Sequence, residues 1–102
     1  MQELLFVYGT LREGGIQERV IGRLAPGEPD ILDDYFRSTI KLSGRTYPII
    51  SPREGSVVEG EVLVLTPEEL KKIDRYEGPA YVRRKVTLRS GKTAWVYQNP
   101  KP

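Results

Sequence analysis

The sequence predicts an α+β fold, built as a small, mainly antiparallel β-barrel with one or two short helices. Three features of the chain support this prediction. An apolar run opens the chain, several segments with strand periodicity follow it, and only one segment carries strong helix signals. Because so many strands in a small domain would otherwise expose unpaired edges, we expect the sheet to curl into a barrel.

The first strand is expected at residues 4–8, a continuous apolar run that ends at Gly9 and Thr10. Uninterrupted apolar residues are typical of a strand that is buried on both faces, so this strand should be central. A short helix is expected over residues 17–21, with Gly22 ending it. Residues 23–30 are interpreted as a loop, because they contain two prolines and a glycine.

The middle of the chain predicts a hairpin followed by the longest strand. Residues 35–42 alternate loosely between apolar and polar side chains, and a Ser-Gly turn follows them. The return strand should cover residues 47–50, with Pro48 at an edge, at a bulge or at the first position, because proline has no N–H for a ladder. We expect a turn over residues 51–56 and then a strand over residues 57–65, with apolar residues on both faces.

One helix carries explicit start and stop signals. Thr66 and Glu69 have the spacing of a capping box, and Pro67 occupies the first helical position, where its missing N–H costs nothing. A Gly-Pro pair at residues 78–79 should end this helix. Two strands joined by a turn at Ser-Gly-Lys complete the prediction, at residues 81–88 and 93–98.

The composition indicates a soluble globular protein and narrows the chemistry. Apolar residues make up 38% and charged residues 29% of the 102 residues, which fits one domain over residues 1–102. The chain contains no Cys and no His, so thiol nucleophiles, thiolate zinc sites and imidazole bases are excluded. Proton transfer would then use a carboxylate, a Tyr or a Lys, and we expect neither a metal nor a cofactor.

Location and partners can also be predicted. The apolar run near the N-terminus is too short for a signal peptide or a membrane span, so we expect a cytoplasmic protein with no membrane partner. All fourteen acidic residues lie at or before Glu77, whereas six basic residues follow it. A basic strand can lie on phosphates. No nucleic-acid-binding motif accompanies these charges, so we favour a solvated hairpin over a nucleic-acid partner.

Two places in the chain can carry chemistry. The first is the turn after the apolar strand, where a glycine lets backbone N–H groups point outward and form an anion-binding nest. From these residues alone we favour an ordinary strand-to-loop turn, because a Gly-Thr pair is common and carries little specificity. The second is an acidic and aromatic cluster at the end of the helix. The residues of the two places are Tyr8, Gly9, Thr10 and Leu11, and Asp74, Tyr76, Glu77 and Tyr81.

The helix end presents two carboxylates, Asp74 and Glu77, three residues apart and therefore on nearly the same helix face. Negative charges near a helix C-terminus oppose the macrodipole, so a carboxylate there needs another reason. Glu59 and Glu61, which flank Gly60 in the long strand, are rival carboxylates. We favour a polar patch for these two, with the glycine marking a bulge or a close approach.

Several segments together resemble the gamma-glutamylcyclotransferase-like family, from about residue 4 to residue 98. The family includes gamma-glutamylamine cyclotransferases and short bacterial and archaeal proteins. The segments are Val7–Arg12, Tyr47-Pro48, Val58–Val62, Leu70 with Asp74–Gly78, Tyr81-Val82-Arg83 and Ala94–Tyr97. The chain departs from many short members after Gly14 and Gly15, where it has Ile-Gln-Glu in place of x-Asn-His.

The resemblance implies a small barrel in which Tyr8, Gly9, Thr10 and Leu11 bind the glutamyl end of a small γ-glutamyl substrate. Glu77 would be the general acid and base, and Tyr81 is expected beside it as a substrate-binding residue. The implied reaction is attack of the glutamyl α-amine on its own δ-carbonyl, which releases 5-oxoproline and an amine or amino acid. The alternative is a non-catalytic module on the same barrel that binds a small ligand or another protein.

Overall fold

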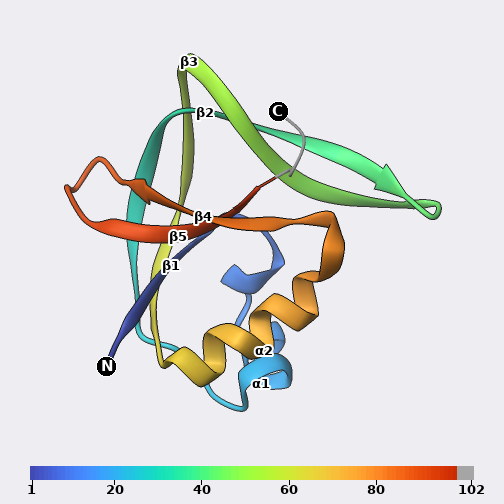
Figure 1. The fold of residues 1–102 in the computed structure, drawn as a ribbon, viewed down its shortest axis with the longest axis vertical. Helices are drawn as coiled ribbons and strands as arrows, with labels where there is room; N and C mark the ends of the chain where they lie inside the picture. Colours follow the sequence, from blue (N-terminus) through green and yellow to red (C-terminus); the bar gives the residue numbers. More distant parts are fainter. Residues whose placement is uncertain (99–102) are drawn as a thin grey trace.

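The computed structural model describes residues 1–98, which form a five-stranded sheet with two α-helices packed on one of its faces (Figure 1). The strands are β1 (Glu3–Val7), β2 (Gly27–Leu42), β3 (Arg45–Leu65), β4 (Val82–Thr87) and β5 (Thr93–Gln98). The helices are α1 (Gly14–Ile21) and α2 (Pro67–Glu77), with 3₁₀ turns η1 (Thr10–Arg12) and η2 (Gly78–Ala80). In this part of the chain, no helix has both the length and the hydropathy needed to cross a bilayer. The predicted α+β class is confirmed.

Strand β1 is the centre of the sheet, as its apolar run predicts. The strand order is β2-β3-β1-β5-β4, with β1 antiparallel to β3 and parallel to β5. Leu5 and Phe6 are 0% and 1% exposed, because helices cover one face of the strand and other strands cover the opposite face. Three of the four strand pairings are antiparallel, so the sheet is mixed but mainly antiparallel.

The sheet curls into a half-barrel rather than a closed barrel. One core lies between the sheet and the helices, and a second core is built from strand and hairpin residues alone, including Phe6, Val58 and Val96. These side chains pack against one another, so the sheet bends around them. Among residues 1–98 no ladder joins the edge strands β2 and β4. The turn after β4 reaches β2 through one backbone hydrogen bond, from Arg89 N–H to the Ile31 carbonyl (2.8 Å), and through side-chain contacts such as the ion pair of Arg89 with Asp33 (2.6 Å).

Strands β2 and β3 are much longer than predicted, and two expected features are wrong. Residues 27–30 belong to β2 rather than to a loop, and residues 51–56 continue β3 rather than forming a turn. Asp34 (φ 63°) and Gly55 (φ 85°) bend both strands, and Gly55 N–H donates to Asp34 Oδ1 (3.0 Å). The glycine and polar residues that predict a turn therefore build a bulge at which the register of the β2–β3 pair shifts, between Asp33↔Val57 and Tyr35↔Pro52.

Beyond this bend, residues 35–52 form a two-stranded arm that projects from the sheet (Figure 1). The predicted hairpin turn is confirmed, with Ser43 (φ 49°) and Gly44 (φ 79°) both in the left-handed region, as primed hairpin turns require. Pro48 lies in this arm and pairs only with Thr39 of β2, so its position is edge-like, as expected for a residue without an N–H.

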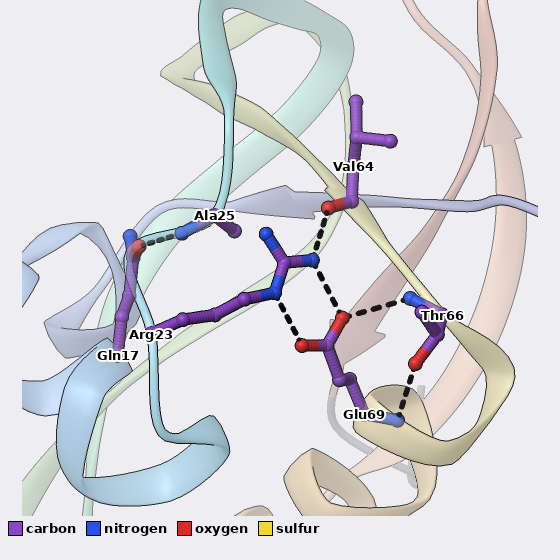
Figure 2. A network of polar contacts seen from close by, with 6 residues as sticks. All are labelled: Gln17, Arg23, Ala25, Val64, Thr66 and Glu69. Atoms are coloured by element: carbon purple, nitrogen blue, oxygen red, sulfur yellow. Dashed lines mark hydrogen bonds and ion pairs between the residues drawn. The ribbon is translucent and has the colours of Figure 1, made fainter.

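The capping box that begins α2 is confirmed and extends into a larger network (Figure 2). Thr66 Oγ1 accepts from Glu69 N–H (3.1 Å), and Glu69 Oε1 accepts from Thr66 N–H (2.9 Å). Arg23, just after α1, donates to both oxygens of Glu69 (2.5 and 2.7 Å). These bonds from Arg23 lower the pKa of Glu69 to about 2. The network fixes α2 against the end of α1, and both helices lie beneath β1.

Candidate active site

A small cavity lies where β1 ends, between the end of α2 and the arm of β3. Its volume is about 30 Å³, which is room for about two water molecules. The lining residues are Phe6, Val7, Tyr8, Gly9, Thr10, Leu11, Pro48, Glu77 and Tyr97. The structure thus brings together the loop and the glutamate that the sequence singles out, although Glu77 lies 66 positions after Leu11.

The loop after β1 passes close under the arm. A Cβ atom added to Gly9 would lie 2.9 Å from Cγ of Pro48, so only glycine fits this approach. Arg12 N–H donates to the Gly9 carbonyl (3.1 Å) and closes η1. Within residues 1–98, the N–H groups of Gly9, Thr10 and Leu11 donate to no backbone carbonyl. The loop therefore keeps free donors at the edge of the cavity.

Two buried side chains hold this loop in place. The Tyr8 hydroxyl donates to the Tyr97 carbonyl (2.6 Å), which ties the end of β1 to β5. Gln17, only 5% exposed, donates through Nε2 to the Leu11 carbonyl (2.8 Å) and accepts through Oε1 from Ala25 N–H (3.0 Å). Sequence reasoning missed Gln17. Its position could have indicated a role, because it is the second residue after the Gly14-Gly15 pair, where many short members of the family have Asn.

Among residues 1–98, Glu77 is the one carboxylate that lines the cavity. It is the last residue of α2, it is partly buried, and burial raises its pKa from 4.5 to about 7. Within the described part of the chain, its carboxylate makes no hydrogen bond and no ion pair with another side chain. A carboxyl group that titrates near neutral pH and has no fixed partner can accept and return a proton.

Asp74, one turn earlier in α2, is already engaged. Arg83 donates to both of its oxygens (2.8 and 3.0 Å), and the Tyr97 hydroxyl donates to Oδ1 (2.6 Å). Arg83 also lies over the ring of Trp95, 4.3 Å from its centroid. The two carboxylates at the helix end thus have different roles: Asp74 holds β4 and β5 against the helix, whereas Glu77 is available at the cavity.

Tyr81, expected from the sequence beside Glu77 as a substrate-binding residue, is not among the residues that line the cavity, and its hydroxyl has a structural partner. That hydroxyl donates to the Pro48 carbonyl (2.5 Å), and the ring packs edge-on against Tyr97 with centroids 6.5 Å apart. Burial and the nearby charge of Glu77 raise the pKa of Tyr81 to about 12. Tyr81 therefore supports the cavity wall at Pro48.

The rival carboxylates lie outside the cavity. Glu61 pairs with Arg12 (3.5 Å), and Glu59 is exposed on β3. The expected close approach at Gly60 is confirmed, because a Cβ there would overlap the carbonyl oxygen of Val7. Among residues 1–98, no cluster of three or more acidic side chains is arranged to hold a metal ion.

The cavity continues into an open groove of about 570 Å³. The two spaces share Tyr8, Gly9, Thr10 and Pro48. The other residues that line the groove are Arg12, Glu13, Arg37, Val57, Val58 and Glu59. A ligand can therefore place one end at Glu77 while the rest extends along the groove toward solvent.

Comparison with known proteins gives consistent results. A family model described as "Gamma-glutamyl cyclotransferase, AIG2-like" matches residues 5–102. The chain is 35% identical over 85 residues to AIG2-like protein D of Arabidopsis thaliana, covering 82% of this chain and 55% of that protein. It is 38% identical over 80 residues to AIG2-like protein B of the same plant, covering 78% and 45%. The chain thus spans about half the length of the curated relatives it matches.

Solved structures show the same fold. A solution structure of an Arabidopsis thaliana protein superposes with a TM-score of 0.84 at 27% identity, covering 98% of this chain and 70% of that one. A structure named "Gamma-glutamyl cyclotransferase" superposes with a TM-score of 0.81 at 22% identity, covering 97% and 67%. An uncharacterised human protein gives a TM-score of 0.84 at 21% identity, covering 98% and 68%.

Proposed function

The chain belongs to the gamma-glutamyl cyclotransferase, AIG2-like family, and from this membership we propose that it is a cyclotransferase acting on small γ-glutamyl compounds. In the proposed reaction, the α-amine of a γ-glutamyl group attacks its own δ-carbonyl carbon. The new C–N bond closes the five-membered ring of 5-oxoproline, and the original amide C–N bond breaks. The leaving group departs as an amine or an amino acid.

The observation that carries the proposal is the position of Glu77. Its carboxylate lines the cavity beside the loop of Tyr8 and Gly9, and its pKa is raised to about 7. A general acid and base works best when its pKa lies near the working pH, because both protonation states are then accessible. The absence of His from the sequence makes a carboxylate with this pKa the natural choice.

Ring closure of this kind needs no nucleophile from the protein. Well-oriented intramolecular reactions reach effective molarities of ~10⁵ M or more, so holding amine and carbonyl in attack geometry supplies much of the rate. As the α-amine attacks, Glu77 accepts its surplus proton. Glu77 then returns that proton to the nitrogen of the leaving group as the amide bond breaks. One carboxylate thus completes the cycle, and proton and charge balance.

The loop after β1 supplies the matching hydrogen-bond donors. The free N–H groups of Gly9, Thr10 and Leu11 suit the substrate's α-carboxylate or the oxyanion that develops on the δ-carbonyl. Gln17 and Tyr8 hold these donors still, which matters because preorganised donors need no rearrangement during the reaction. The leaving group would lie in the open groove beyond Pro48.

The test is release of 5-oxoproline by the full chain from a panel of γ-glutamyl amines and γ-glutamyl dipeptides. The proposal predicts stoichiometric formation of 5-oxoproline and the free amine or amino acid. Saturable binding of panel members without any release would favour the alternative, a non-catalytic module that binds small ligands. If the protein neither binds nor turns over any member of the panel, the proposed substrate class is contradicted.

A further inference from the structure

The two arginines that line the groove differ in whether they form an ion pair. Arg12 is paired with Glu61 (3.5 Å). Arg37 lines the same groove, is exposed, and forms no ion pair within residues 1–98. An unpaired guanidinium that faces a ligand space is a strong binding site for a carboxylate, because its planar fork of N–H groups can donate to both carboxylate oxygens.

Arg37 also lies at a particular place along the groove. Arg37 pairs with Ile50 in the ladder of β2 and β3, and Ile50 packs in the same core cluster as Tyr8. Arg37 and Tyr8 also line the groove together. Tyr8 belongs to both the cavity and the groove. Glu59, in contrast, borders a further open space toward β2. Among residues 1–98, Arg37 is therefore a cation without an ion-pair partner that lines the groove together with Tyr8 of the cavity wall.

We propose that Arg37 is a specificity-determining residue that selects leaving groups with a carboxylate next to the scissile nitrogen. This inference rests on the proposed function, and it makes γ-glutamyl-α-amino acids the preferred substrate class. When the glutamyl end occupies the cavity, the amide nitrogen lies near the rim at Tyr8. In an α-amino acid the carboxylate is two bonds from that nitrogen, which brings it to Arg37. A simple amine has no carboxylate that could accept hydrogen bonds from Arg37.

The acidic residues of the groove limit this preference to a single carboxylate. Glu13 and Glu59 also line the groove, and neither is paired with a cation in the described residues. A second anionic group on the leaving amino acid would approach these like charges, which disfavours it. We therefore expect γ-glutamyl-alanine to be a better substrate than γ-glutamyl-glutamate.

The test compares γ-glutamyl-alanine with γ-glutamyl-alaninamide, which differ only in carboxylate against carboxamide. We expect the wild-type protein to prefer the acid by about tenfold in kcat/KM, mainly through a lower KM. This factor corresponds to a difference of about 1.4 kcal/mol in free energy. Arg37→Gln should bring the ratio close to one, and Arg37→Lys should retain part of it. Arg45→Gln, which removes an exposed charge from the same arm, should leave the ratio unchanged.

Binding measured by calorimetry separates this inference from the proposed function. Both compounds are titrated into the Glu77→Gln variant and into the double variant that also carries Arg37→Gln. If the wild type releases no 5-oxoproline, the proposed function fails, while a binding preference that depends on Arg37 still supports the carboxylate site. An unchanged ratio in Arg37→Gln, a wild-type preference for the amide, or no binding of either compound would overturn the inference.

Discussion

The Tyr81 hydroxyl donates a hydrogen bond to the backbone carbonyl of Pro48 across an O···O distance of 2.5 Å. This bond joins the start of β4 to the arm of β3. The Pro48 ring in turn lies so close to Gly9 that no side chain fits between them. Three segments far apart in the sequence therefore meet in one wall of the cavity, and each can be tested separately.

Removing the Tyr81 hydroxyl should loosen this wall. Tyr81→Phe keeps the ring that packs against Tyr97 but leaves the Pro48 carbonyl without its donor. We expect a loss of about 1 kcal/mol in the free energy of unfolding, together with a several-fold rise in KM. Urea unfolding and steady-state kinetics measure the two effects. Tyr47→Phe, a neighbouring change on the arm, is the control, and equal effects of both variants would contradict the role given to Tyr81.

Adding one methyl group at Gly9 should damage both stability and activity. Gly9→Ala forces a Cβ to 2.9 Å from Pro48 Cγ, so the arm or the loop must shift. Such overpacking typically costs about 1–3 kcal/mol. Gly15→Ala is the matched control, because a Cβ there meets nothing within 4 Å and the site is helical. This control should be neutral or more stable by about 0.5–1 kcal/mol. A Gly9→Ala protein as stable as wild type would show that the approach to Pro48 is not tight.

The raised pKa of Glu77 should make stability fall as pH rises. Between pH 4.5, the ordinary pKa, and about 7, the native protein holds a proton that the unfolded chain has released. The contribution is therefore complete below pH 4.5 and is lost as pH rises through 7. Glu77→Gln should be as stable as wild type at pH 4 and more stable by roughly 1–3 kcal/mol at pH 8. Urea unfolding at both pH values measures this, and a difference independent of pH would contradict the burial of the carboxyl.

The parts of the fold that could be predicted are those governed by local signals. The apolar run of β1 and the capping box at Thr66 each depend on a few adjacent residues, and both are confirmed. The bend at Asp34 and Gly55 could not be predicted in this way. Turn-forming residues produce a positive φ in a hairpin and in a bulged ladder alike, and only the long-range pairing of β2 with β3 distinguishes them.

The candidate site was predictable in part for the same reason. A glycine at the end of a buried strand and two carboxylates at a helix C-terminus mark two places in the sequence. The choice of Glu77 over Asp74 comes from the family resemblance. The contributions of Pro48, Tyr97 and Arg37 come from strands that approach the cavity only in the folded chain. Their side chains have no local pattern that marks a site, so the structure was needed to find them.

The most direct test of the account is the turnover of Glu77→Gln compared with that of Glu61→Gln. Glutamine preserves the size of the side chain but cannot accept a proton, so only the chemical step should suffer. We expect kcat for 5-oxoproline release to fall about 10²–10⁴-fold in Glu77→Gln, with the fold retained by circular dichroism. Glu61, which pairs with Arg12 outside the cavity, should change kcat little. Near wild-type turnover in Glu77→Gln, together with an inactive Glu61→Gln, would contradict the assignment of the catalytic carboxylate.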